Sequence, residues 1–321
     1  MLIDGLQCGN FNRGVFETLH EGGFTCLTAS LGFWEGSQGA LDAIGRWRHM
    51  ARVNSDLMTI AVTAADIEVA DRDGKVAVLL GFQNSSLFDG RVAFVEFFSE
   101  LGVRVVQLTY NNQNEAGGSC YETHDNGLSR FGREMVRAMN RDGILVDLSH
   151  VGDTTSLQAI EFSEKPVAIT HANAASLFPH KRNKSDAIIR ALAERGGVLG
   201  CATYRNITPE SACASIDGWC EMVARTVEIG GIDHVAIGTD EGHNTTQADL
   251  DWMRQGYWTQ GTDYGAGSAQ RPGKVPKPDW LSRTSELVKV REGLARVGFD
   301  DEERQKILSG NWLRLYREVF G

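Results

Sequence analysis

The sequence lacks several features that mark common classes of protein. Its 321 residues hold no cluster of lysine and arginine to offset a formal charge of −10, which argues against nucleic acid or an anionic membrane as a partner. No apolar run approaches the length of a membrane span, and no basic, then apolar, then small-residue leader opens the chain. We therefore expect a cytoplasmic protein.

Cysteine is scarce and shows no zinc-finger spacing. Several of the six cysteines lie in apolar, strand-like runs, which is typical of reduced, buried thiols. An apolar content of 42% and a charged content of 23% are those of a soluble globular protein. The length allows one large α/β domain or two ordinary ones.

Two short stretches organise what is present. Residues 143–150 and 166–171 are each an apolar run of strand length that ends in a histidine, His150 or His171, and a helical pattern at 153–163 separates them. Continuous apolar runs suit strands that are buried on both faces of a parallel sheet. A crossover helix keeps such strands parallel, so both histidines are expected at the same carboxyl-terminal edge.

Similar strand-like runs recur along the chain, with helical patterns between most of them. They lie at 2–6, 24–31, 76–82, 103–109, 143–149, 166–170, 197–203 and 234–239. Eight strands that alternate with helices predict a (β/α)₈ barrel of the TIM type rather than an open doubly wound sheet. A Gly-rich dinucleotide turn, which would favour the open sheet, does not follow the first strand. We expect one domain over 1–321, with C-terminal helices packed on the barrel.

Barrel enzymes carry their chemistry at the carboxyl ends of the strands. His150, His171 and Asp240 follow three nearby strands there, and two neutral imidazoles with a carboxylate can bind a divalent cation or activate water. A lone histidine at such a place is usually structural, but three such residues together favour a functional site. Two long loops, 111–127 and 257–278, emerge at the same edge, and the second is expected to be a lid or a subunit contact.

At these positions the sequence resembles the membrane (renal) dipeptidase family of the amidohydrolase superfamily. The resemblance covers nearly the whole chain and is densest from 103 to 240. It rests on the segments Asp147-Leu148-Ser149-His150-Val151, Ile169-Thr170-His171, Lys181-Arg182-Asn183, His234-Val235-Ala236-Ile237-Gly238-Thr239-Asp240, Gly127-Leu128-Ser129-Arg130-Phe131-Gly132 and Gly310-Asn311-Trp312-Leu313-Arg314. It implies a barrel with a binuclear zinc site, in which His150 and His171 hold one zinc, Asp240 faces the other zinc and the attacking water, and Arg182 holds the substrate carboxylate.

The chain departs from that family at several implied ligands. The His-x-Asp pair of the family's first strand corresponds to Leu6 and Cys8, and the metal-bridging Glu corresponds to Gln83. A family histidine that stabilises the oxyanion corresponds to Tyr110. These replacements mark a divergent member that lacks the His-x-Asp pair and the bridging Glu.

Charge decides what the departures mean. Two zinc ions bring four positive charges into a water-poor barrel mouth, where three family carboxylates are reduced to one, Asp240. A two-metal site is therefore not expected. One divalent ion on His150 and His171 is expected, with Gln83, Cys8 or water completing its shell, and a site without metal is the alternative.

These residues lead to one preferred function and two alternatives. We expect a dipeptidase-like metallopeptidase that hydrolyses the C–N bond of a dipeptide or another small carboxylate-bearing amide. Asp240 would be the base, Tyr110 a hydrogen-bond donor to the oxyanion and Arg182 the carboxylate ligand. The alternatives are a metal-independent enzyme for another small substrate and a non-catalytic binding protein. A homodimer is the default expectation for such a barrel.

Overall fold

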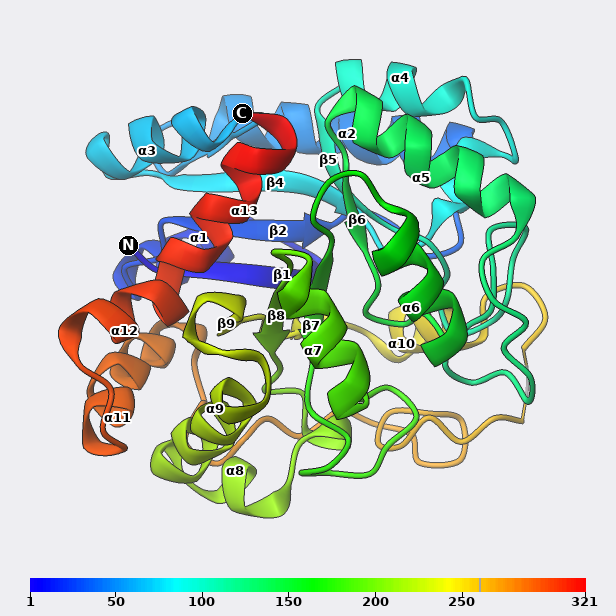
Figure 1. Ribbon diagram of the computed structural model, residues 1–321. Coiled ribbons are helices and arrows are strands. Elements are labelled where there is room, and N and C mark those ends of the chain that lie inside the picture. Colours follow the sequence, from blue (N-terminus) through cyan, green and yellow to red (C-terminus); the bar gives the residue numbers. More distant parts are fainter. Residues whose placement is uncertain (260) are drawn as a thin grey trace.

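The computed structural model describes residues 1–259 and 261–321, which form a curled sheet of parallel strands surrounded by helices (Figure 1). The strands are β1 (Ile3–Gly9), β2 (Cys26–Ser30), β3 (Met58–Ile60), β4 (Val76–Phe82), β5 (Val103–Gln107), β6 (Leu145–Asp147), β7 (Ala168–Ala172), β8 (Val198–Cys201), β9 (Val235–Ile237) and β10 (Glu241–His243). Every strand pairing is parallel.

The helices fill the connections between strands. They are α1 (Arg13–Glu21), α2 (Ser37–Val53), α3 (Ala64–Arg72), α4 (Phe94–Glu100), α5 (Arg130–Asp142), α6 (Asp153–Phe162), α7 (Asp186–Glu194), α8 (Glu210–Ala214), α9 (Ile216–Gly230), α10 (Gln247–Gln255), α11 (Val290–Arg296), α12 (Asp301–Gln305) and α13 (Asn311–Phe320). Shorter turns are η1 (Ser85–Phe88), η2 (Arg205–Ile207), η3 (Ile232–His234), η4 (Thr284–Lys289) and the π-helical η5 (Lys306–Gly310).

The sheet closes on itself. Its strand order is β10-β1-β2-β4-β5-β6-β7-β8-β9, and residues 238–240 lead directly from β9 into β10, which pairs with β1. The backbone N–H of Asp240 also donates to the carbonyl of Leu6 over 3.1 Å. The predicted barrel is thus confirmed. Its eight expected strands are β1, β2 and β4 to β9, and the short strand β10 is an additional element that joins β9 to β1.

Two elements between residues 58 and 72 were not predicted. Strand β3 is three residues long and pairs with β4 outside the ring, so it is not one of the eight strands that a barrel requires. Helix α3 begins at a capping box in which the Thr63 side chain accepts from the Asp66 N–H, while the Asp66 carboxylate accepts from the Thr63 N–H. That box is a signal in the sequence that could have located the helix.

The C-terminal helix α13 closes the amino-terminal end of the barrel. Trp312 and Tyr316 are fully buried there against the side chains that begin the strands, including Ile3, Cys26 and Val198. The Trp312 indole N–H donates to the Ile237 carbonyl over 2.8 Å, which fixes the helix to β9. This end of the barrel is therefore packed with apolar groups, and a site for chemistry must lie at the opposite end.

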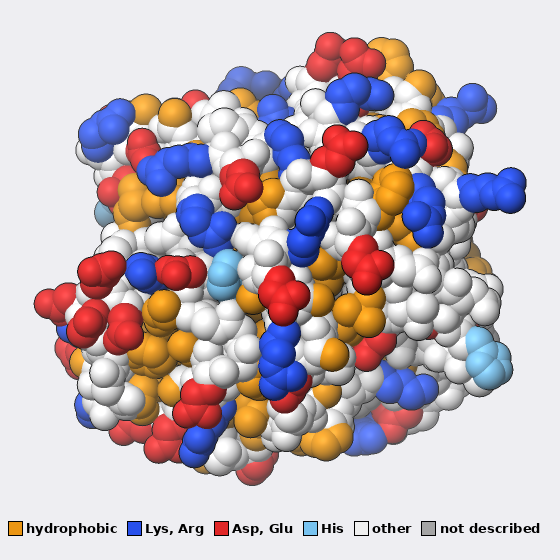
Figure 2. Space-filling view, viewed as in Figure 1, with side chains coloured by type: hydrophobic (Ala, Val, Ile, Leu, Met, Phe, Trp, Pro, Cys, Tyr) orange, Lys and Arg blue, Asp and Glu red, His pale blue; other side chains and the backbone are white. Residues whose placement is uncertain are grey.

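The molecular surface is charged and mixed. On the face shown in Figure 2, acidic and basic side chains alternate, apart from a group of acidic side chains over α12. Within the described residues, no helix combines the length and the hydropathy needed to span a membrane.

We predict that Trp312→Ala lowers the free energy of unfolding by about 3–5 kcal/mol, because it leaves a cavity under α13 and removes the bond to Ile237. Urea unfolding followed by circular dichroism measures this loss. The matched control is Trp258→Ala, since the Trp258 side chain is 66% exposed and its loss should change stability by less than about 1 kcal/mol. Equal losses in the two variants would contradict the packing described for α13.

Candidate functional site

A cavity of about 630 Å³ opens at the carboxyl-terminal ends of the strands. Its floor is formed by residues that follow strands, and its cover by α10 and residues 274–278. Of the predicted site residues, the lining includes Cys8, Gln83, Tyr110, His150, Arg182 and Asp240. The size suits a small ligand of two amino acid residues.

His150 and His171 face each other at the end of β6 and β7. Their Nε2 atoms are 3.2 Å apart, and both side chains are buried. The His150 Nδ1–H donates to the Asn111 side-chain oxygen over 2.7 Å, so the proton of His150 lies on Nδ1 and its Nε2 carries a lone pair. The His171 Nδ1 lies 2.7 Å from the Thr170 hydroxyl.

The buried carboxylate of Asp147 fixes this pair. It accepts hydrogen bonds from the Ser149 hydroxyl over 2.6 Å and from the Thr170 N–H and hydroxyl over 2.9 and 2.8 Å. Because the Thr170 hydroxyl donates to Asp147, its oxygen accepts the proton of His171 Nδ1. The His171 Nε2 then also carries a lone pair, and the two lone pairs point at one another.

Two lone pairs that face each other across 3.2 Å repel one another unless a cation lies between them. Burial, and next the charge of Arg182, lower the pKa of both imidazoles well below the usual range, which disfavours a proton in that place. Two nitrogens bound at 2.0–2.1 Å to one tetrahedral zinc lie roughly 3.3 Å apart. The pair therefore fits one divalent metal ion. Within residues 1–259 and 261–321, no three His, Cys, Asp or Glu side chains gather closely enough to form a larger metal site.

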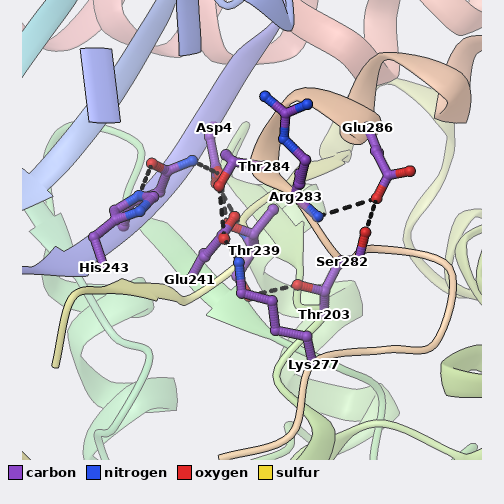
Figure 3. A network of polar contacts seen from close by, with 11 residues as sticks. Asp4, Thr203, Thr239, Glu241, His243, Lys277, Ser282, Arg283, Thr284 and Glu286 are labelled. Atoms are coloured by element: carbon purple, nitrogen blue, oxygen red, sulfur yellow. Dashed lines mark hydrogen bonds and ion pairs between the residues drawn. The ribbon is translucent and has the colours of Figure 1, made fainter. Parts of the chain in front are cut away.

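Asp240 lies at the turn between β9 and β10, with a backbone φ of 59° that is uncommon for a residue other than glycine. The Asp4 carboxylate holds this turn by accepting from the Thr239 N–H over 2.8 Å and from the Thr239 hydroxyl over 2.5 Å (Figure 3). The side chain of Asp240 makes no hydrogen bond within the described residues. Burial raises its pKa to about 7, against the lowering effect of the nearby Arg182 and Arg254 charges.

Arg182 is buried between the two histidine strands. Its guanidinium donates to the Ser149 carbonyl over 2.5 Å and to the His171 carbonyl over 3.1 Å. It forms no ion pair within the described part of the chain, although it lines the cavity. A guanidinium that is oriented by backbone carbonyls and lacks a carboxylate partner is suited to bind an anionic ligand.

Tyr110, Gln83 and Cys8 line the same cavity. The Tyr110 ring packs on the His150 ring at a centroid distance of 4.2 Å, and its hydroxyl makes no hydrogen bond within the described residues. Gln83 is buried, and its backbone carbonyl accepts a hydrogen bond from the Gln107 side-chain amide. Burial and the carboxylates of Asp240 and Glu241 raise the pKa of the Cys8 thiol, which keeps that thiol protonated in the absence of a cation.

Further polar residues of the cavity surround the predicted site, and Arg254 among them was not predicted. Glu241 forms an ion pair with Lys277 and accepts from the Thr284 hydroxyl over 2.7 Å (Figure 3). This pair ties the predicted loop 257–278 to the cavity mouth, although residue 260 of that loop lies outside the described residues. Arg254, on α10, donates to the Tyr204 hydroxyl over 2.7 Å. The Thr246–Asp249 capping box of α10 is a signal that could have located this helix.

The fold and the residues at its mouth define a barrel of the metallo-dependent hydrolase type. The family model described as membrane dipeptidase (peptidase family M19) matches residues 19–254. The chain therefore belongs to the M19 membrane dipeptidase family, as the resemblance in its sequence predicted.

Solved structures and curated relatives agree with this assignment. An amidohydrolase from Pseudomonas aeruginosa is 36% identical, with a TM-score of 0.94 over 100% of this chain and 97% of that one. Dipeptidase AC, a metallopeptidase of family M19, shares the fold with a TM-score of 0.81 at 19% identity, over 100% of this chain and 98% of that one. Dipeptidase tcpJ of Claviceps purpurea is 33% identical over 274 residues, which are 83% of this chain and 56% of that protein. The chain spans about half the length of the curated relatives it matches.

We predict that the raised pKa of Asp240 makes stability depend on pH. A carboxyl group whose pKa is higher in the folded than in the unfolded state holds a proton that the unfolded chain has lost. Its contribution is complete below about pH 4 and is lost as the pH rises through about 7. Asp240→Asn should therefore gain thermal stability relative to the unaltered protein as the pH rises from 4 to 8.

Thermal unfolding of metal-free protein across that pH range tests this expectation. Glu302→Gln, at a position whose side chain is 82% exposed, is the surface control. A difference between Asp240→Asn and the unaltered protein that stays constant with pH would show that the Asp240 pKa is not raised.

Proposed function

We propose that this protein is a dipeptidase-like amidohydrolase that cleaves the C–N bond of a small substrate bearing a carboxylate. One observation carries the proposal above all. An Asp240 carboxylate with a raised pKa shares one cavity with His150 and with a buried Arg182, and within the described residues Asp240 has no hydrogen-bond partner and Arg182 no ion pair. A base, an anion-binding group and a metal ligand are thus within reach of one small molecule.

The residues of the chain take distinct roles in this proposal. Arg182 binds the substrate carboxylate and thereby sets the position of the scissile bond. Asp240 removes a proton from the attacking water, a task for which a pKa near 7 is well matched at neutral pH. Tyr110, whose hydroxyl is unengaged, donates a hydrogen bond to the oxygen that becomes negative, and the cavity cover limits the access of bulk water.

His150 and His171 hold the metal ion in this proposal. A divalent ion there, most simply zinc, supplies a Lewis acid that polarises the substrate carbonyl or its attacking water. Gln83 and water are proposed to complete its shell. Cys8, the other expected ligand, lines the cavity but does not gather with the two histidines into a group of three ligands within the described residues. Asn111 and Thr170 keep the outer nitrogens of the two imidazoles protonated, so that the inner nitrogens stay available.

The six free cysteines are consistent with the cytoplasmic location that forms part of this proposal. We also propose that the protein forms a homodimer.

We predict about one divalent ion per chain in protein purified without added metal. Elemental analysis should give a ratio near one, and His150→Ala or His171→Ala should reduce it to nearly zero because one imidazole alone binds weakly. His20→Ala, at an exposed position on α1, is the control and should leave the ratio unchanged. A ratio of two would contradict the single-metal assignment, and a ratio of zero would favour the metal-independent alternative.

We predict that Asp240→Asn lowers kcat for dipeptides by about 10²- to 10⁴-fold while the substrate still binds, because the amide cannot take a proton from water. A panel of dipeptides, each paired with its C-terminal amide, supplies the assay. The amides should react poorly, since they lack the group that Arg182 binds. Asp217→Asn, at the surface, is the control. Absence of turnover across the panel, with or without divalent metal, would refute the proposed activity.

A further inference from the structure

A second buried arginine lies in the cavity, away from the two histidine strands. Arg254 is 7% exposed and extends from α10, where one terminal nitrogen donates to the Tyr204 hydroxyl over 2.7 Å. The other terminal nitrogen, Nη1, is fully buried and has no hydrogen-bond partner within the described residues. A buried donor of this kind costs free energy unless an acceptor reaches it, so its environment is incomplete without a ligand or a water molecule.

Tyr204 has unused capacity of the same kind. Its hydroxyl oxygen accepts from Arg254 and also from the Asn206 side-chain amide over 2.6 Å, so its own proton is not engaged by either group. Tyr204 and Arg254 both line the cavity. Together they offer an N–H and an O–H donor in one place, which is the arrangement that a carboxylate accepts well.

The charge inside the cavity points the same way. Its lining contains five cationic side chains, of which Arg205 is paired with Asp279 and Glu210, and Lys277 is paired with Glu241. Lys274 is exposed to solvent. Of the charges that form no ion pair with another described residue, the lining then retains the buried Arg182 and Arg254 and the half-buried Asp240, in a protein whose formal charge is −10.

A neutral dipeptide does not balance these charges. Its ammonium and carboxylate groups cancel, so the excess of positive charge, to which a divalent ion on His150 and His171 would add, is unchanged when it binds. A second carboxylate on the substrate reduces that excess, because one carboxylate can pair with Arg182 and the other with Arg254. Both arginines line the same cavity as Asp240, and their charges lower the pKa of its carboxyl.

We propose that Arg254, with Tyr204, binds a second carboxylate of the substrate, so that the preferred substrates are acidic dipeptides or related acyl amino acids with two carboxylates. This inference rests on the proposed hydrolase function and adds the class of substrate to it. Arg254 is then a residue that determines specificity, distinct from the Arg182 anchor.

Matched substrates and variants test the assignment. Dipeptides that contain Glu or Asp at either position are compared with the Gln or Asn isosteres, which have the same shape without the charge. The unaltered protein should prefer the acidic member of a pair. Arg254→Gln should lower kcat/KM for that member by about 10- to 100-fold more than for the isostere, since any effect on the pKa of Asp240 is common to both substrates. Arg296→Gln, at a surface ion pair with Asp217, is the matched control and should affect neither.

Two further variants keep the test decisive if Arg254→Gln does not fold. Arg254→Lys retains the positive charge but loses the planar guanidinium that can donate two parallel hydrogen bonds. Tyr204→Phe removes the hydroxyl that orients the guanidinium. Both variants should therefore reduce the preference for the acidic substrate. Equal loss for the acidic substrate and its isostere in all three variants would show a structural role and overturn the inference. No preference for the acidic substrate in the unaltered protein would also overturn it.

A binding measurement separates this inference from the proposed activity. N-acetyl-glutamate should stabilise the unaltered protein against thermal unfolding more than N-acetyl-glutamine does, and Arg254→Gln should abolish the difference. This result would support the second carboxylate site even if no dipeptide in the panel were hydrolysed. Equal stabilisation by the two compounds, together with hydrolysis of neutral dipeptides, would refute the second site and leave the proposed activity intact.

Discussion

Two buried aspartates hold the reactive end of the barrel in place, and they do so in the same way. Asp147 accepts hydrogen bonds from the N–H and the hydroxyl of Thr170, and Asp4 accepts from the N–H and the hydroxyl of Thr239. In each case the threonine comes directly before a predicted functional residue, His171 or Asp240. Each aspartate thus joins two strands and sets the backbone from which the next side chain points into the site.

This arrangement has a cost that the hydrogen bonds offset. Burial raises the pKa of both aspartates, of Asp4 to about 6, because a charge without water is unfavourable. The hydroxyl and N–H donors act against that effect and replace the lost water. Asp4 and Asp147 therefore serve as hydrogen-bond acceptors within the protein, while the side chain of Asp240 makes no hydrogen bond to any described residue.

The sequence predicted those parts of the structure that depend on local patterns. The barrel followed from repeated apolar runs, and the meeting of His150 and His171 followed from two such runs with one crossover helix between them. Strand β3 was missed because it pairs outside the ring and is not one of the eight strands that the alternation of a barrel predicts. Arg254 was missed because its role depends on α10 folding over the cavity and on the position of Tyr204, which is 50 residues away in the chain. Contacts of that kind arise from tertiary packing and leave no pattern in a local stretch.

The same buried charges link substrate binding to the reactivity of Asp240. Burial raises the pKa of that carboxyl, and Arg182 and Arg254 lower it. A carboxylate that pairs with an arginine cancels part of this lowering effect, because the positive charge is then compensated. Asp240 becomes a stronger base when an anionic substrate occupies the cavity than when the cavity holds water alone. In the proposed reaction an arginine of this cavity can therefore act twice. It holds the substrate carboxylate, and the neutralisation of its charge makes Asp240 a stronger base toward the attacking water.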